Sequence, residues 1–157
     1  MTAVVLIPLL ALAAPLTLRA QGGNITPTTP DTNARPVTRA VPRSGPVIID
    51  GRLDEAAWQT APAITHFTQQ QPVEGVPPTQ RTEVRILYDN AAIYIGARMY
   101  ETGGAAAVTS RLTRRDNSPS SDILRIDFDP YHDRLHSVEF DVNPAGWRGD
   151  ATNYDRS

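Results

Sequence analysis

The chain of 157 residues carries 15 basic and 17 acidic groups, a formal net charge of −2, and it contains no cysteine. This balance excludes the concentrated basic surface of a nucleic-acid-binding protein, and the absence of cysteine excludes disulfides, thiolate metal sites and a cysteine nucleophile. A hydrophobic content of 40% suits one packed core, and 14 Pro with 10 Gly favour short strands joined by turns over a helical bundle.

The N-terminal segment has the composition of an export signal. Residues 3–16 form an uncharged apolar run, which matches the core of a signal peptide and is shorter than the roughly 20 residues that a membrane span needs. Cleavage after the small residue Ala20 would define residues 1–20 as the signal peptide. The protein is therefore predicted to reach the periplasm, the outer membrane or the extracellular space. A buried N-terminal helix is the alternative for the same run.

The next segment, residues 21–46, is rich in Pro, Thr, Gly and Asn and contains no aromatic residue. Such a composition buries too little apolar surface to offset the entropy that is lost on ordering. We predict a disordered linker here, which leaves residues 47–157 as the folded domain.

From residue 47 onwards, short apolar segments are separated by turn signals. Most of the segments alternate apolar and polar side chains, which is the pattern of strands with one buried face. The predicted strands are residues 47–49, 82–89, 93–99, 123–129, 138–142 and 147–154. A helical turn is predicted at residues 53–58, and Asp89-Asn90 favours a hairpin between the second and third strands.

Successive hairpins with one apolar face need a second sheet to cover that face. The fold is therefore predicted to be all-β, an antiparallel, jelly-roll-like β-sandwich. Phe128 and Phe140 are expected to face inward from neighbouring strands. About five strands and a polar final segment make an incomplete sandwich, so we expect the chain to be truncated at its C-terminus.

Several short motifs follow one another in residues 47–157. In chain order they are Ile49-Asp50-Gly51-Arg52-Leu53-Asp54-Glu55-Ala56-Ala57-Trp58, Thr82-Glu83-Val84-Arg85-Ile86-Leu87-Tyr88-Asp89, Ala92-Ile93-Tyr94-Ile95-Gly96, Ser121-Asp122, Asp127-Phe128-Asp129, and Phe140-Asp141-Val142-Asn143-Pro144-Ala145-Gly146 with Asp150. This order and spacing resembles the carbohydrate-binding module family 9-like domain. The resemblance implies a saccharide-binding β-sandwich that accompanies polysaccharide-degrading enzymes. It extends to the version at the N-terminus of larger exported bacterial proteins, whose downstream region resembles an outer-membrane barrel.

Two positions depart from the sugar-binding members of that family. Pro119 stands where those members carry a stacking Trp, and Arg125 stands where they carry a Glu that hydrogen-bonds sugar hydroxyls. The leading hypothesis is a non-catalytic accessory module that binds a polysaccharide or oligosaccharide and is linked to polysaccharide catabolism. The second is a structural or interaction domain of an outer-membrane-associated protein without sugar binding. The third is part of an O-glycosyl hydrolase.

The candidate carbohydrate-binding residues are two tryptophans and Arg125. Trp147 follows a turn, and an exposed indole there would stack on the apolar face of a pyranose. Trp58 has the same chemistry, but its position on a helical turn after Leu53 favours a place in the core.

Four carboxylates, those of Asp122, Asp127, Asp129 and Asp133, lie within twelve positions. As hard oxygen ligands they would suit a structural Ca²⁺. Their mutual repulsion needs a counter-charge, which Arg125 on the same strand face would also supply. A calcium site and an Arg-centred network are therefore both open. A glycosidase acid/base pair is disfavoured, because a strand face offers no cleft.

Overall fold

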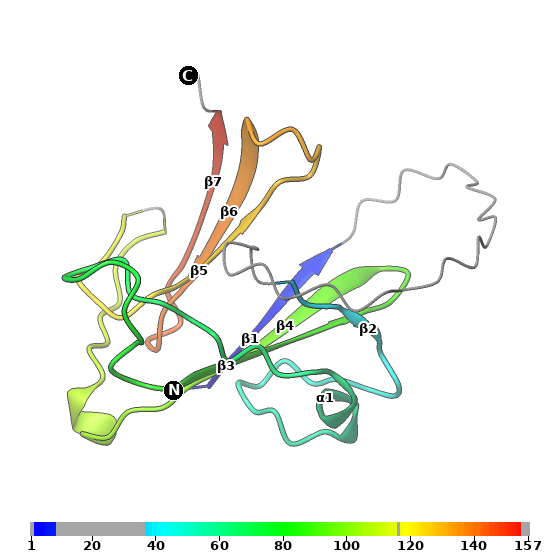
Figure 1. The fold of residues 1–157 in the computed structure, drawn as a ribbon, viewed down its shortest axis with the longest axis horizontal. Coiled ribbons are helices and arrows are strands. Elements are labelled where there is room, and N and C mark those ends of the chain that lie inside the picture. Colours follow the sequence, from blue (N-terminus) through cyan, green and yellow to red (C-terminus); the bar gives the residue numbers. More distant parts are fainter. Residues whose placement is uncertain (1, 9–36, 116, 155–157) are drawn as a thin grey trace, which may run out of the picture.

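The computed structural model describes residues 2–8, 37–115 and 117–154, and of residues 3–8 it describes the backbone alone. Most of the regular secondary structure of these residues is strand, arranged in two sheets (Figure 1). The strands are β1 (Thr2–Pro8), β2 (Val41–Pro42), β3 (Thr82–Tyr88), β4 (Ala92–Met99), β5 (Leu124–Phe128), β6 (His136–Val142) and β7 (Arg148–Tyr154). The described helical segments are α1 (Ala56–Thr60) and the 3₁₀ turn η1 (Ala105–Ala107). The fold class is all-β, as the sequence predicts.

One sheet has the strand order β1-β4-β3-β2, and the other has the order β5-β6-β7. Neighbouring strands are antiparallel, except that β2 runs parallel to β3. The predicted hairpin is the pair β3–β4, and it turns at Asp89, whose carboxylate accepts the backbone N–H groups of Ala91 and Ala92 at 2.8 and 3.0 Å. Those hydrogen bonds lower the pKa of Asp89, with the bond from Ala91 contributing most.

One strand prediction for the N-terminal half is wrong. Residues 47–49 form no strand: the side chains of Ile48 and Ile49 are 62% and 45% exposed, and the Ile48 N–H donates to the Glu55 carboxylate at 2.6 Å instead of to a neighbouring strand. Two residues of the predicted linker, Val41 and Pro42, form the strand β2. Val41 packs against the core while β2 pairs with β3.

The described part of the predicted signal peptide, Thr2–Pro8, is the strand β1 and not a helix. Residues 9–36, which hold the rest of the signal peptide and most of the linker, lie outside the described residues. The predicted helical turn begins at Ala56 and not at Leu53.

The motif at residues 49–58 builds a small core under α1. Asp50 accepts the Arg52 N–H at 2.9 Å, and Gly51 takes a φ of +83°, a conformation that glycine adopts without strain. Glu55 then accepts the indole N–H of Trp58 at 3.1 Å, in addition to the Ile48 N–H. Trp58 is 0% exposed, which confirms its place in the core.

Trp58 and Leu53 lie against Gly96 on β4. A Cβ atom at Gly96 would come within 2.5 Å of Leu53 Cδ2 and 3.0 Å of Trp58 Cζ3, so a larger residue there would force these side chains to shift. Leu87 on β3 belongs to the same cluster and is fully buried. The opposite face of this hairpin carries Ile95, around which apolar side chains of β3, β4, β5 and β6 gather. The hairpin is therefore covered on both faces, which explains why its apolar alternation is imperfect.

Candidate functional site

A groove of about 580 Å³ lies between the segment before residue 116 and the start of β7. Its walls include Leu112, Thr113, Arg115, Asp141, Trp147 and Asp150. A smaller hollow of about 140 Å³ shares several of these residues and adds Ser118, Arg125 and Glu139. Two of the three residues predicted to bind carbohydrate, Trp147 and Arg125, therefore line one continuous region of the surface.

Trp147 forms the floor of the groove and not an exposed stacking platform. Its side chain is 3% exposed, and its indole N–H donates to the carbonyl oxygen of Arg114 at 3.1 Å. The ring packs over β7, where a Cβ atom at Gly149 would lie 2.8 Å from Trp147 Cη2. The expectation of an exposed Trp147 is wrong, because the segment around Arg114 crosses this side of the three-stranded sheet and covers the ring.

Asn143 holds that segment against the sheet. Its side-chain oxygen accepts the Trp147 backbone N–H at 2.9 Å, and its amide group donates to the Arg111 carbonyl at 2.6 Å and to Ser121 Oγ at 3.1 Å. Asn143 is 6% exposed, so these bonds satisfy a buried amide. The motifs around Asn143 and Ser121 therefore share one structural task, which is to fix the rim of the groove.

Arg125 is the chemically strongest group at the site. Its Nε donates to Asp141 Oδ1 at 2.9 Å and its Nη2 donates to Asp141 Oδ2 at 2.8 Å, while the same Nη2 lies 3.0 Å from Glu139 Oε1. The hydrogen bonds to Asp141 and the nearby charges of Asp141, Glu139 and Asp127 raise the pKa of Arg125, although partial burial opposes this. The side chain of Arg125 is 51% exposed while that of Asp141 is 5% exposed, so the guanidinium faces the hollow and the carboxylate lies beneath it.

An Arg-centred network therefore exists, but with different partners from those that the sequence suggested. Asp141 and Glu139 stand on β6, and Asp141 is the register partner of Arg125 on β5. Sequence reasoning missed both acids, because cross-strand partners can be named only once the register is known. The signal that identifies them is the antiparallel pairing of residues 124–128 with residues 138–142.

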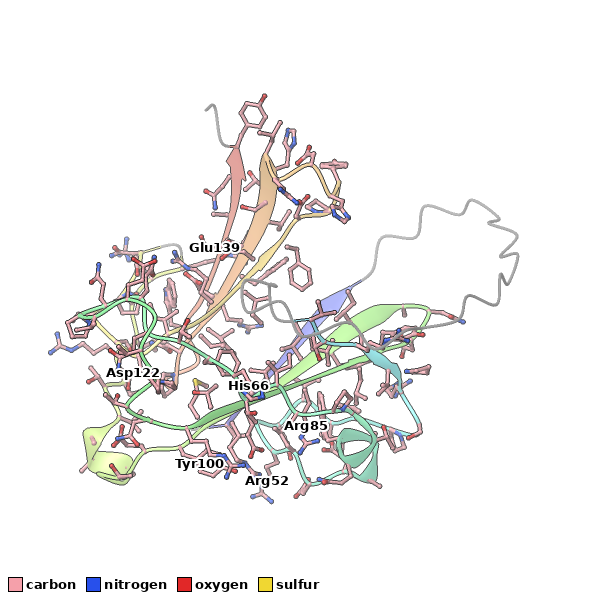
Figure 2. All side chains as sticks on the ribbon, viewed as in Figure 1. Arg52, His66, Arg85, Tyr100, Asp122 and Glu139 are labelled. Atoms are coloured by element: carbon pink, nitrogen blue, oxygen red, sulfur yellow. The ribbon has the colours of Figure 1, made fainter. Side chains whose placement is uncertain are left out.

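The four aspartates predicted to bind a metal are not gathered in one place. Asp122 Oδ2 accepts the Thr109 N–H at 2.9 Å near the start of β5, and Figure 2 shows it well away from Glu139. Asp127 projects from the exposed face of β5. Beyond the far end of that strand, Asp129 accepts the backbone N–H groups of Asp133 and Arg134 at 3.1 and 2.9 Å.

Asp133 has its own local partners. Its Oδ1 accepts the N–H groups of Leu135 and His136, and its Oδ2 lies 2.5 Å from His136 Nδ1. Among the described residues no group of three or more His, Asp or Glu is placed to hold a metal ion. Calcium binding stays a prediction, which a Ca²⁺ titration followed by melting temperature would test.

An exposed aromatic cluster at the far end of the same sheet escaped the sequence reasoning. The His136 ring lies 5.4 Å from the Tyr131 ring and 4.6 Å from the Tyr154 ring, measured between centroids. Tyr131 is 73% exposed and Tyr154 is 55% exposed. Residues 136 and 154 are register partners on β6 and β7, so the cluster too depends on strand pairing.

No protein-family model matches the chain, and searches of curated proteins and of solved structures give no significant match. The helices in the described part of the chain are too short to cross a membrane.

Proposed function

We propose that the chain is a carbohydrate-binding accessory module of an exported protein that takes part in polysaccharide catabolism. In this proposal the sugar lies in the groove beside Arg125, over the floor made by Trp147. The module has no catalytic activity of its own, because it works by holding the parent protein on its polysaccharide.

The observation that carries the proposal is the alternation of charged donors and acceptors along a concave surface. Arg125 with Asp141 forms one paired unit, and Arg115 with Asp150 forms a second across the groove. A pyranose presents adjacent hydroxyl groups that each donate and accept, and planar charged groups of both signs are suited to such pairs. Leu112, which is 71% exposed, supplies apolar surface at the rim for the C–H face of a sugar ring.

The exposed rings of Tyr131 and Tyr154 support the same function for longer chains. Aromatic faces pack on the apolar faces of sugars, and these two are accessible where Trp147 is not. We also infer that the two sheets pack as a β-sandwich. The support is the cluster around Ile95, which unites side chains of β3 and β4 with those of β5 and β6.

A structural or interaction domain without sugar binding is the competing proposal. Two observations favour it: Pro119 is buried, and Trp147 is covered by the neighbouring segment. Neither residue then offers a ring to a sugar, and the charged pairs would serve only to hold the sheet together.

A glycan array and affinity electrophoresis in soluble polysaccharides separate the two proposals. We expect the intact chain to bind at least one polysaccharide, and Asp150→Asn to weaken that binding about tenfold, since one hydrogen bond to a charged group contributes about 1.5 kcal/mol. Arg52→Gln is the matched control, because Arg52 is exposed on the other sheet's side of the molecule (Figure 2). Failure to bind any glycan on the array would favour the structural domain.

A further inference from the structure

The strand β1 occupies one whole edge of β4. Its seven residues pair with β4 without interruption, from Thr2 opposite Arg98 to Pro8 opposite Ala92. In the sheet order β1 is the outermost strand, and β4 is its described neighbour (Figure 1). The geometry of β1 therefore defines what kind of segment fits this edge: seven extended residues that run antiparallel to β4.

The composition of β4 is that of a central strand. Ala92, Ile95 and Ala97 are 4%, 5% and 0% exposed, and Arg98 is the one charged residue of the strand. Natural edge strands are short, charged, interrupted by proline or bulged, because an uncovered apolar edge recruits other strands. β4 has eight residues and pairs regularly along its length, so it shows none of these protections except Arg98 near its end. Its edge is built to be paired.

The residues that cover this edge are also the first residues of the predicted signal peptide. Cleavage after Ala20 would remove β1 and expose the backbone N–H and C=O groups on one side of β4. The remaining neighbour, β3, already pairs with β2 on its other side. After cleavage, β4 would become an edge strand with one unpaired side. Its two faces would still pack against Trp58 and against the cluster around Ile95.

We infer that the edge of β4 is a binding site for an extended, uncharged apolar segment of a partner polypeptide, which adds antiparallel to β4 in the place that β1 holds in the uncleaved chain. The backbone of such a segment supplies affinity, and its alternate side chains supply selectivity, as in other cases of strand addition. The uncleaved leader then acts as a temporary occupant that keeps the site closed until export is complete. Both the vacant edge and the role of the leader rest on the predicted export, because β1 fills this edge in the uncleaved chain.

The register argues for a partner segment over a second copy of β4. In the β1 register, Ile7 stands opposite Ile93 and Val5 stands opposite Ile95, and β-branched residues at opposite positions favour strand pairing. Two β4 strands paired antiparallel about their middle would instead set Arg98 opposite Ile93. The favoured ligand is therefore β-branched and uncharged through its centre.

The test uses the full chain with Val4→Pro and Val5→Pro together. In an antiparallel pair, every second residue of a strand directs its N–H group to the same neighbour. Of two adjacent residues in β1, one therefore donates to β4, and replacing both with proline removes that donor. The probe is a fluorescent synthetic peptide with the sequence of residues 2–8. We expect saturable one-to-one binding, with amide exchange in β4 slowed at least tenfold. The unaltered chain should bind at least tenfold more weakly, because its own β1 is tethered at high effective concentration.

The control peptide carries the same two prolines and should not bind. The inference is overturned if the probe does not bind the variant, if both peptides bind equally, or if the variant dimerises through β4 in analytical ultracentrifugation. Amide exchange in β6 reports whether the variant is folded. If it is not, the unaltered chain is incubated with a hundredfold excess of labelled peptide, and absence of strand exchange then overturns the inference.

Discussion

Arg125 and Asp141 form a two-point ion pair between opposite positions of β5 and β6. The Nε and Nη2 atoms of Arg125 donate to the two carboxylate oxygens of Asp141 at 2.9 and 2.8 Å. Asp141 is 4% exposed although it stands on the polar face of its strand, and the Trp147 ring lies beside it over Gly149, its register partner on β7. The guanidinium thus satisfies both oxygens of a buried carboxylate, and it also faces the proposed sugar-binding hollow.

Arg125→Met should lower the free energy of unfolding by about 2 kcal/mol. The change takes both guanidinium hydrogen bonds from a buried carboxylate, and hydrogen bonds to charged groups contribute about 1.5–3 kcal/mol. Urea denaturation at neutral pH measures the loss. The matched control, Arg52→Met, removes an exposed arginine and should cost less than about 0.5 kcal/mol. Equal stability of the two variants would show that the pair contributes nothing to folding.

Gly96→Ala should destabilise the protein by about 1–3 kcal/mol, because the added methyl group overlaps Leu53 and Trp58. Thermal or urea unfolding measures the cost. Leu53→Ala in the same chain makes room for the methyl group, so Gly96→Ala should cost markedly less in that background than in the unaltered chain. Additive effects of the two changes would contradict the close approach of β4 to Leu53.

Phe140→Ala should lower stability by about 3 kcal/mol, the lower end of the range for phenylalanine in a core, because Phe140 is half-buried. Phe140 packs in the cluster around Ile95, and its ring meets that of Phe128 edge to face, with centroids 6.1 Å apart and an interplanar angle of 77°. This packing confirms the inward orientation that the alternation predicts. Tyr131→Ala is the control, since Tyr131 is 73% exposed and should lose less than about 0.5 kcal/mol. A cost at Phe140 as small as that at Tyr131 would contradict the strand register.

Apolar side chains recur at alternate positions of strands β3 to β6, which made the ranges of these strands predictable even for β3 and β4, which are covered on both faces. β3, β4 and β5 lie within a residue or so of their predicted ranges, and β6 starts two residues earlier than predicted. The prediction of a strand at residues 47–49 was wrong for a different reason. Their β-branched run has strand propensity, but the Glu55 carboxylate takes the Ile48 N–H, and tertiary contacts override propensity in such short runs.

The candidate site was predictable only in part. Arg125 could be singled out from its strand face, but its partners Asp141 and Glu139 stand on another strand and became visible only with the register. Trp147 shows the other limit. The sequence predicts that a Trp after a turn is exposed. Here the indole instead donates to the Arg114 carbonyl, 33 residues earlier in the chain, and the segment around Arg114 covers the ring. Long-range coverage of this kind leaves no local pattern in the sequence.

Asp133 should titrate well below an ordinary aspartate. Hydrogen bonds from the Leu135 and His136 backbone N–H groups, and then from the His136 side chain, lower the pKa of Asp133 from 3.8 to about 2. Carboxyl NMR titration of the folded protein should give this lowered midpoint. A midpoint near 4 would show that the turn does not hold the carboxylate as described.

The same shift fixes the pH dependence of the Asp133 contribution to stability. The folded state binds the proton less readily than the unfolded state, so the contribution is complete above the unfolded pKa near 4 and is lost as pH falls towards about 2. Asp133→Asn should therefore be destabilising at pH 7, and its difference from the unaltered chain should shrink between pH 4 and pH 2. Urea unfolding across this range, with the exposed Asp54→Asn as control, measures the difference. The substituted asparagine keeps an oxygen acceptor but loses the charge. If the difference in unfolding free energy between the two proteins stays constant down to pH 2, the ionised carboxylate is not the stabilising group.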